Sequence, residues 1–250
     1  MSEQLKAIVL AAGKGTRLRT EGIDLPKVLR EAAGRPLLSY VLEGLSFLPP
    51  EDITLVVGYE GEKVTAAFPG YPKVYQCPQL GTGHAVQCAE SAFKGFEGHI
   101  LICNGDMPLL PRSAYEKLVR EHMEQGNACT LMAGVTEAPL PYGRILRDET
   151  GGFLRIVEDR DCTEEERKIK ELNTGDYIFD AAQLWRALTT LRPDNAQGEY
   201  YITDAPSWLR KQGEKVGVCA ACTAEEMIGV NDVEQLRQVE EIIQRRRGEA

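Results

Sequence analysis

Short apolar runs alternate with segments of helical periodicity along the first 135 residues, and this alternation restricts the fold more than any other feature. Runs with the length and composition of strands cover 6–12, 52–58, 72–77, 99–104 and 128–135, and helical segments cover 35–47, 83–93 and 111–125. Strands that alternate with helices form a parallel sheet covered by helices on both faces. The pattern therefore predicts a doubly wound α/β domain.

The second half of the chain predicts an excursion from this sheet and a return to it. Two extended runs flank Glu149-Thr150-Gly151-Gly152, which indicates a β-hairpin. The charged stretch 161–172 is expected to be an exposed helix, with Thr163 and Glu166 at the spacing of a capping box. Further elements are a strand at 173–180, a helix at 202–213, a strand at 215–223 and a terminal helix with an apolar stripe. We expect one domain over 1–230 and a C-terminal helix or arm over 231–250.

Composition excludes several classes of protein. The 250 residues carry a formal net charge of -9, which argues against a nucleic-acid partner, and no apolar run has the length of a membrane span. Seven cysteines at irregular spacing suggest no disulfide framework, so we expect a reduced, cytoplasmic setting. Cys219 and Cys222 form an isolated CxxC in a predicted strand, which favours two buried thiols over a metal or redox site.

The loop "LAAGKGTRL", residues 10–18, follows the first predicted strand and is rich in glycine and positive charge. Six cations oppose three acids between Lys14 and Arg35, so this segment is positive within an acidic protein. Backbone N–H groups in such a loop can face an anion, and phosphate is the expected ligand. The spacing fits neither a Walker A loop nor GxGxxG, which would need glycine at Leu18. A simple strand-to-helix turn remains the alternative.

Other positions favour a phosphate site with a metal. Asp106 follows an apolar strand, where ligands of an open parallel sheet bind, and a carboxylate there could hold Mg²⁺ beside phosphates. A turn cap is the alternative for Asp106, and Asn231 by itself is better explained as a helix cap. Lys27 follows Pro26, which restricts the backbone before it, although a solvated lysine is an equal alternative. In "QLGTGHA", glycines again free the backbone next to Thr82, and His84 is expected to pack or cap rather than catalyse.

Taken in order, these segments resemble the sugar nucleotidyltransferases, and within them the pyrophosphorylase half of the bifunctional N-acetylglucosamine-1-phosphate uridyltransferases. The resemblance runs through "LAAGKGTRL", "PKVL", "GRPLLSYVLE", "QLGTGHAV", "GDMPLL", "YGRI", "IVED", "ELNTGDYIF", "NAQGEYYITD" and "GVND". It implies a Rossmann-like fold of the nucleotide-diphospho-sugar transferase type.

The resemblance also implies roles for individual residues. The positions expected to bind the nucleotide are Leu10, Ala11, Ala12, Gly13, Gln76, Gly81 and Thr82. The cations expected to act on the phosphates are Arg17 and Lys27, and the expected Mg²⁺ pair is Asp106 and Asn231. The positions expected to line the sugar pocket are Asn104, Gly143, Glu158 and Asn173.

The implied reaction joins UTP and N-acetylglucosamine 1-phosphate, with in-line attack of the sugar phosphate on the α-phosphorus and no protein nucleophile. Asn104 stands where a tyrosine is familiar in the family, which leaves the sugar open, and the connection 19–27 is longer than usual. The hexapeptide β-helix of the bifunctional enzymes is absent from these 250 residues, so acetyltransfer is not expected. Alternatives are a uridylyl- or thymidylyltransferase for another sugar 1-phosphate and a non-catalytic nucleotide-sugar-binding module. An oligomer through the C-terminal helix is also considered.

Overall fold

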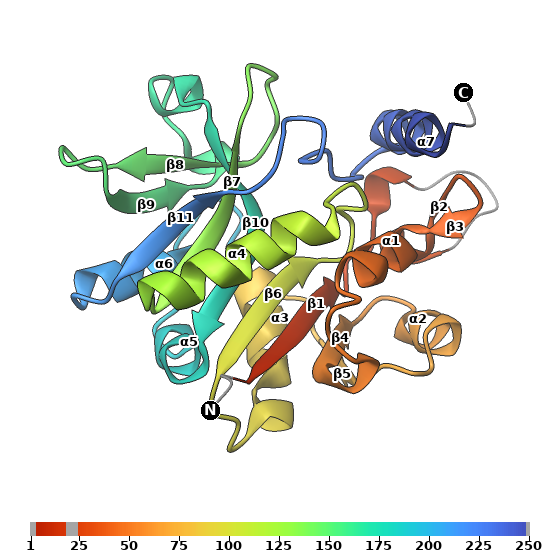
Figure 1. Ribbon diagram of the computed structural model, residues 1–250, viewed down its shortest axis with the longest axis horizontal. Coiled ribbons are helices and arrows are strands. Elements are labelled where there is room, and N and C mark those ends of the chain that lie inside the picture. Colours follow the sequence, from red (N-terminus) through yellow and green to blue (C-terminus); the bar gives the residue numbers. More distant parts are fainter. Residues whose placement is uncertain (1–3, 19–24, 249–250) are drawn as a thin grey trace.

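The computed structural model describes residues 4–18 and 25–248. Within them, nine strands form one sheet, and seven of these follow the order β11-β7-β10-β6-β1-β4-β5 (Figure 1). The strands are β1 (Leu5–Ala11), β4 (Ile53–Val57), β5 (Lys73–Tyr75), β6 (His99–Asn104), β7 (Cys129–Val135), β10 (Glu171–Asp180) and β11 (Val216–Ala220), with β8 (Gly143–Arg147) and β9 (Phe153–Val157) beside them. A separate two-stranded sheet pairs β2 (Glu31–Ala32) with β3 (Arg35–Pro36).

The predicted, mostly parallel sheet is confirmed, and antiparallel pairing is found at β10 and at the hairpin. β1 pairs in parallel with β4 and β6, β4 with β5, and β7 with β11. β10 lies antiparallel between β6 and β7. The hairpin of β8 and β9 is also confirmed, and its turn is closed by a hydrogen bond from the Gly151 N–H to the Asp148 carbonyl.

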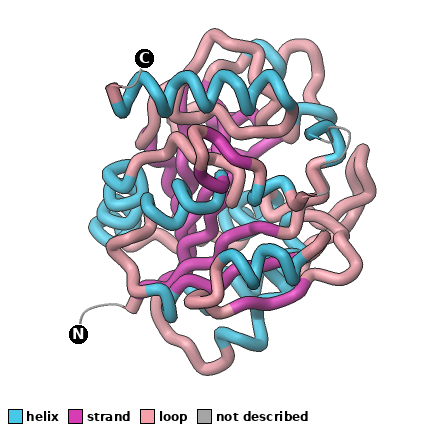
Figure 2. The backbone as a smooth tube through the Cα atoms, turned by 90° about the vertical axis from the view of Figure 1, so that its right-hand side faces the viewer, coloured by secondary structure: helices cyan, strands magenta, loops and turns pink. Residues whose placement is uncertain are grey.

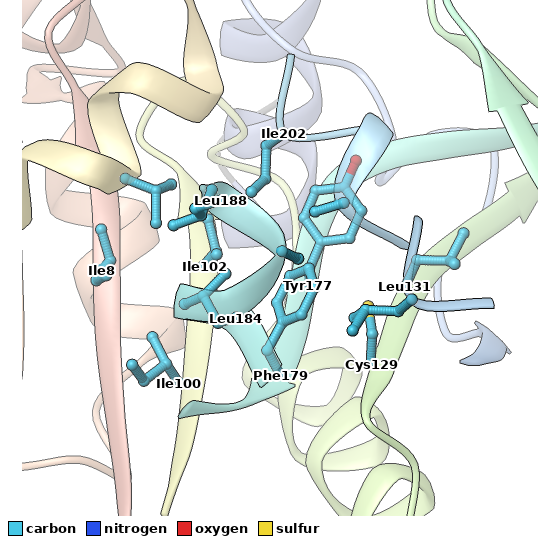
Figure 3. Packing of buried hydrophobic residues seen from close by; sticks show 14 of the residues in the cluster. Ile8, Ile100, Ile102, Cys129, Leu131, Tyr177, Phe179, Leu184, Leu188 and Ile202 are labelled. Carbon is cyan, nitrogen blue, oxygen red and sulfur yellow. The ribbon is translucent and has the colours of Figure 1, made fainter. Parts of the chain in front are cut away.

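Helices cover both faces of the sheet, as the alternation predicts. The helices α1 (Leu37–Gly44), α2 (Gly61–Ala67) and α4 (Arg112–Gln125) pack in one core cluster, whereas α3 (Thr82–Ala89), α5 (Ala181–Leu188) and α6 (Asp204–Lys211) pack in the other. Side chains alternate between these clusters along β1, because successive residues of a strand point to opposite faces. Ile8 lies in the cluster drawn in Figure 3, and Ala7 and Val9 lie in the opposite one.

The last helix, α7 (Val233–Arg247), crosses the outside of the domain (Figure 2). Asp232 caps it, since its carboxylate accepts the Gln235 N–H at 2.9 Å. The stripe predicted from the sequence is largely buried against the same chain, where Ile243 and its neighbours pack with Leu37 and Leu109. Association of copies through this helix therefore stays a prediction. Among the described residues, no helix has the length and apolar composition needed to cross a membrane.

The prediction of an exposed helix at 161–172 is wrong. Only two 3-10 turns form there, Asp159–Asp161 and Glu166–Lys168, and the chain enters β10 at Glu171. The capping-box contacts are nevertheless present, because the Glu166 carboxylate accepts the Thr163 N–H at 2.8 Å. The last two residues of the stretch, Glu171 and Leu172, pair in the sheet as the start of β10, so tertiary structure outweighs propensity there.

The CxxC thiols are not placed as a reactive pair. Cys219 is buried in β11, and Cys222 lies beyond the strand with its Sγ 3.4 Å from the Ala133 carbonyl. Burial raises the pKa of each thiol to about 12. Both thiols are therefore protonated at neutral pH, which disfavours nucleophilic chemistry.

Candidate active site

The candidate site lies where the order of the strands reverses. From β1 the chain continues to β4 and β5 on one side, whereas β6 pairs on the other side. Leu10 and Asn104, near the ends of β1 and β6, are register partners, and the Gly105 N–H donates to the Leu10 carbonyl at 3.0 Å. The two loops that follow these strands therefore begin side by side, at the position where open α/β sheets bind ligands.

A cleft of about 590 Å³ opens between these loops. Nine of the predicted site residues line it, namely Leu10, Ala12, Gly13, Lys27, Gln76, Gly81, Thr82, Asn104 and Asp106. Ala11 does not line the cleft, because its side chain packs in the core. Arg17 is exposed on the turn Thr16–Leu18 and is also absent from the lining, whereas Lys14 of the same loop lines it.

Gly15 explains part of the glycine content of the first loop. Its φ is +60°, and a Cβ built on it would lie 2.9 Å from the Cβ of Lys27. A side chain here would be strained and would push the lysine away. Gly15 thus allows the backbone to turn and the Lys27 stem to approach the loop. The rest of the connection, 19–24, lies outside the described residues.

Gln76 is buried at the floor of the cleft, directly after β5. Its amide nitrogen donates to the Gly81 carbonyl at 2.9 Å and lies 3.2 Å from Nδ1 of His84. His84 therefore packs against Gln76, as expected from the sequence. These contacts commit the amide nitrogen of Gln76 and leave its oxygen as the hydrogen-bonding atom available to a ligand in the cleft.

The second glycine loop contains Gly81 and Gly83, and both of them lie close to the backbone of Tyr200. The Gly83 N–H donates to the Tyr200 carbonyl at 2.7 Å, so this group is not available to phosphate. A Cβ on Gly81, whose φ is +107°, would lie 2.7 Å from the same carbonyl. Close approach of the Tyr200 backbone accounts for glycine at both positions and commits the Gly83 N–H, whereas a phosphate contact at Gly81, which lines the cleft, stays a prediction. Thr82, between them, remains exposed at the cleft.

A smaller cavity of about 190 Å³ continues the cleft toward β8 and β10, and it shares Thr82, Asn104 and Asp106 with the larger one. Gly143, Glu158 and Asn173 line it, as the resemblance implies. The Asn173 amide nitrogen donates to the Tyr177 hydroxyl at 2.6 Å, whereas its buried oxygen has no hydrogen-bond partner. Burial raises the pKa of Glu158, and the Thr203 hydroxyl opposes that shift.

Asn104 stands at the boundary between the two cavities. Its amide nitrogen donates to the Thr174 carbonyl at 3.1 Å, and a Cβ on Gly175 would lie 2.4 Å from that nitrogen. The side chain thus lies against the bulge in β10, where Gly175 leaves room for it. A compact amide, rather than a large ring, forms this part of the wall.

Three predicted residues converge on one point at the edge of both cavities. The Lys27 ammonium is ion-paired with the Asp106 carboxylate and donates to Oδ1 of Asn231 at 2.7 Å. Asn231 is 204 positions from Lys27 and reaches this point because the Val230 N–H donates to the Asp106 carbonyl at 2.9 Å. The alternative of Asn231 as a helix cap is wrong, since Asp232 caps α7.

The same convergence tests whether this point suits a divalent cation. Oxygens of Asp106 and Asn231 already share one positive group, the Lys27 ammonium, so they can face a common cation. Among the described residues, no cluster of three or more His, Cys, Asp or Glu side chains could hold a metal. One carboxylate and one amide oxygen fit Mg²⁺, which takes its remaining ligands from phosphate and water.

Asp176 is a buried carboxyl beneath this site that the sequence analysis did not select. Its Oδ1 accepts the Asn104 backbone N–H at 3.2 Å, and its Oδ2 has no partner. Burial raises its pKa to about 7, with a further rise from the Asp106 charge, while the hydrogen bonds from Asn104 and Thr174 lower it. Asp176 thus holds a proton in the folded protein that the unfolded chain releases near pH 4.

This shift predicts a pH dependence of stability. Between about pH 4 and pH 7 the folded protein keeps a proton on Asp176 that the unfolded chain has released, so stability falls as pH rises through this window. The Asp176→Asn variant cannot ionise there. We expect its free energy of unfolding, relative to wild type, to rise by about 1.4 kcal/mol per pH unit in this window and to level off above it. Urea unfolding at three pH values measures this difference.

The difference in free energy of unfolding between wild type and Asp176→Asn reports Asp176 alone, because other titrating groups contribute equally to both proteins. His122, whose pKa burial lowers to about 3, gives the opposite slope, but it contributes equally to both proteins. If the difference in free energy of unfolding between wild type and Asp176→Asn stays constant from pH 4 to pH 7, the assignment is contradicted.

Several lining residues were missed although their motifs were recognised. Glu199 lines the larger cavity and Thr203 the smaller one, and both belong to "NAQGEYYITD". Gln79, in the loop after β5, lines the larger cavity, and its amide donates to the Ala12 carbonyl. Tyr142 precedes Gly143 and lines the smaller one. These residues could have been found from the sequence, because each is a polar residue that lies within or beside a recognised motif.

Comparison with known proteins agrees with this architecture. Residues 7–170 match the family model described as the MobA-like NTP transferase domain. The chain is 42% identical over 241 residues to the bifunctional protein GlmU of Streptococcus thermophilus and 41% identical over 245 residues to that of Caldanaerobacter subterraneus. These alignments cover 96% and 98% of this chain but 52% of each relative, so the chain spans about half their length.

A solved structure supports the fold separately. A Bacillus anthracis protein assigned as a glucose-1-phosphate thymidylyltransferase superimposes with a TM-score of 0.72 and 21% identity, over 96% of this chain and 95% of that one. The Rossmann-like fold and the resemblance predicted from the ordered motifs are therefore confirmed. With a family model matched over 7–170, the chain belongs to the family of MobA-like NTP transferase domains.

Proposed function

We propose that the protein transfers a uridylyl group from UTP to N-acetylglucosamine 1-phosphate, forming UDP-N-acetylglucosamine and pyrophosphate. The observation that carries the proposal is the convergence of Lys27, Asp106 and Asn231 where the two cavities join. A nucleotide in the larger cavity and a sugar phosphate in the smaller one would bring their phosphates together at this point. Cation and metal ligands are needed there, since negative charge accumulates in phosphoryl transfer.

The larger cavity suits a pyrimidine nucleotide. The Gln76 oxygen would accept the N3–H of uracil, because its amide nitrogen is already committed to Gly81. Ala12 and Gly13 have short or no side chains and so leave space for the nucleotide at this wall. A Cβ on Gly13 would meet no atom within 4 Å. Lys14 is placed in the lining of the same cavity, where it would attract the triphosphate.

The smaller cavity suits a sugar with several hydrogen-bond donors. The buried Asn173 oxygen lacks a partner and would accept a hydrogen bond from a hydroxyl or an amide N–H of the sugar. Leaving such an atom unsatisfied costs about 1–3 kcal/mol, so a bound donor would recover that energy. Glu158 offers a second acceptor in the same wall.

In the proposed reaction a phosphate oxygen of the sugar 1-phosphate attacks the α-phosphorus of UTP in line. A new P–O bond forms, the bond between the α- and β-phosphates breaks, and pyrophosphate leaves with its electron pair. Lys27 would bind the phosphates and neutralise charge at the junction, while Asp106 and Asn231 would hold Mg²⁺. When bound there, Mg²⁺ would supply charge neutralisation and orientation of the phosphate oxygens. Arg17, which is exposed outside the cleft, is proposed only to approach the departing phosphates.

Asn104 favours a second candidate in the same reaction class. Its compact amide would accept a sugar that the aromatic wall familiar in the family does not, so a uridylyl- or thymidylyltransferase for another sugar 1-phosphate is considered as well. A binding module without turnover would have little use for a two-ligand metal site beside a lysine. Acetyltransfer is not proposed for this chain.

A crossed panel tests the proposal. UTP and dTTP are each incubated with Mg²⁺ and with N-acetylglucosamine, glucose and galactose 1-phosphates, and released pyrophosphate is measured. We expect the highest kcat/KM for UTP with N-acetylglucosamine 1-phosphate. A higher value for another pair would establish the second candidate. Absence of pyrophosphate with every pair, together with tight calorimetric binding of UDP-N-acetylglucosamine, would identify a binding module instead.

A further inference from the structure

A separate cavity of about 410 Å³ lies outside the cleft and is lined by residues of α1, the start of α4 and the end of α7. Four arginines line it, Arg35, Arg112, Arg246 and Arg247, against one acid, Glu43. Arg112 and Arg246 are paired with Glu116 and Glu225, which lie outside the lining, so the lining itself is positive within a chain whose formal net charge is -9. A positive lining at a concave surface attracts anions.

Arg247 is the least compensated of these cations. Its guanidinium donates to the Ala33 carbonyl at 3.3 Å and to the Tyr40 hydroxyl at 3.1 Å, and it makes no ion pair with an acid among the described residues. Those two bonds use neutral acceptors, so they orient the guanidinium without neutralising it. Its remaining N–H groups are available to a charged acceptor.

A second guanidinium that lines the cavity contacts the same ring. Arg35 lies 4.6 Å and Arg247 5.7 Å from the centroid of Tyr40. Arg35 is paired with Glu43 at 2.9 Å, but that carboxylate side chain is 63% exposed, and such surface pairs contribute little. An incoming anion could therefore replace Glu43 and bridge the two guanidiniums at little cost.

Apolar residues also line the cavity, and they narrow the class of ligand. Pro108, Leu109 and Ile243 line the cavity, and Leu109 and Ile243 are themselves buried. Guanidinium groups match the geometry of phosphate oxygens in paired hydrogen bonds. We propose that this cavity binds a small phosphate monoester, with the phosphate between Arg35 and Arg247 and the organic group against the Leu109 wall.

The cavity is connected to the cleft through two segments. Leu109 follows Asp106 by three residues, and α7 begins just after Asn231. Arg246 already joins these segments, since its guanidinium donates to the Leu109 carbonyl at 2.9 Å. A bound ester would thus touch both elements that carry the proposed metal pair. We expect it to change the KM for UTP, a consequence that rests on the proposed function, whereas binding itself does not.

Calorimetric titration with phenyl phosphate tests binding in the whole chain. We expect Arg247→Ala to weaken binding at least tenfold, as loss of a charge-assisted hydrogen bond predicts. The matched control is Arg237→Ala on the same helix, whose guanidinium pairs with Glu234 and Glu241 and does not line the cavity, so affinity should be unchanged. Equal thermal unfolding of both variants shows that the fold is kept.

A third variant separates this cavity from the cleft. Lys27→Met removes the cation of the cleft but none of this cavity, so phenyl phosphate should bind to it as to wild type. The proposal is overturned if wild type binds no phenyl phosphate at millimolar concentration, if Arg247→Ala binds unchanged, or if Lys27→Met abolishes binding. An unchanged KM for UTP with phenyl phosphate bound would overturn only the connection to the cleft.

Discussion

Pyrophosphate release by the Asp106→Ala variant is expected to fall by about 10³-fold. The carboxylate is the only full negative charge in the proposed metal pair, and removal of a group that stabilises developing charge typically costs about 10²–10³ in turnover. The effect should appear mainly in kcat, because the charge that the metal would neutralise develops in the transition state. Steady-state assays with the best substrate pair of the crossed panel measure it.

Asp52→Ala is the matched control for this variant. Asp52 is also a partly exposed aspartate paired with a lysine, since its carboxylate lies 3.3 Å from the Lys6 ammonium, but it lies outside the cleft. We expect its turnover to match wild type and both variants to unfold at similar temperatures. If Asp106→Ala retains a rate near that of wild type, a metal must be held elsewhere or is not required.

The Lys27→Met variant is expected to lose about 10²-fold in turnover and yet to bind a divalent cation more tightly in the absence of nucleotide. Turnover falls while metal affinity rises because the Lys27 ammonium has two different interactions. It would stabilise the phosphates during the reaction, but in the free protein it occupies the oxygens of Asp106 and Asn231 that a metal needs. Methionine keeps the stem that packs on Gly15 and removes the competing charge.

Titration with Mn²⁺ followed by electron paramagnetic resonance measures the second effect. We expect about tenfold tighter binding in Lys27→Met than in wild type, whereas Lys6→Met, which removes the partner of Asp52, should bind as wild type does. Weaker Mn²⁺ binding in Lys27→Met would show that the lysine supports the metal site rather than competing for it.

Much of the fold could be predicted because its elements are encoded locally. The strands at 99–104 and 128–135 are continuous apolar runs, and α4 shows its period within its own residues. Prediction failed where the local signal was weak or overruled. α2 begins with Gly61 after Glu60 in a left-handed conformation, which no propensity favours. The helical signal of 161–172 yielded at its last two residues to the pairing of β10, which begins at Glu171.

The candidate site also has parts that the sequence predicts and parts that it does not. Asp106 could be selected from the sequence because a carboxylate just after a parallel strand lies where such sheets bind ligands, and the glycine loop indicated phosphate. The sequence could not assign Gly83 to the Tyr200 carbonyl, place Arg17 outside the cleft, or detect Asp176 beneath Asn104. Each of these depends on contacts between segments far apart in the chain.

The sequence by itself determined the alternating strands and helices, the glycine loop after the first strand and the carboxylate after the fourth strand of the sheet, since each is written in a few adjacent residues. Only the tertiary structure decided that Lys27, Asp106 and Asn231 share one point and that four arginines line one cavity. The reason is physical. Periodicity and chain stiffness act over a few residues, whereas the position of a side chain across 204 residues is set by sheet order and packing.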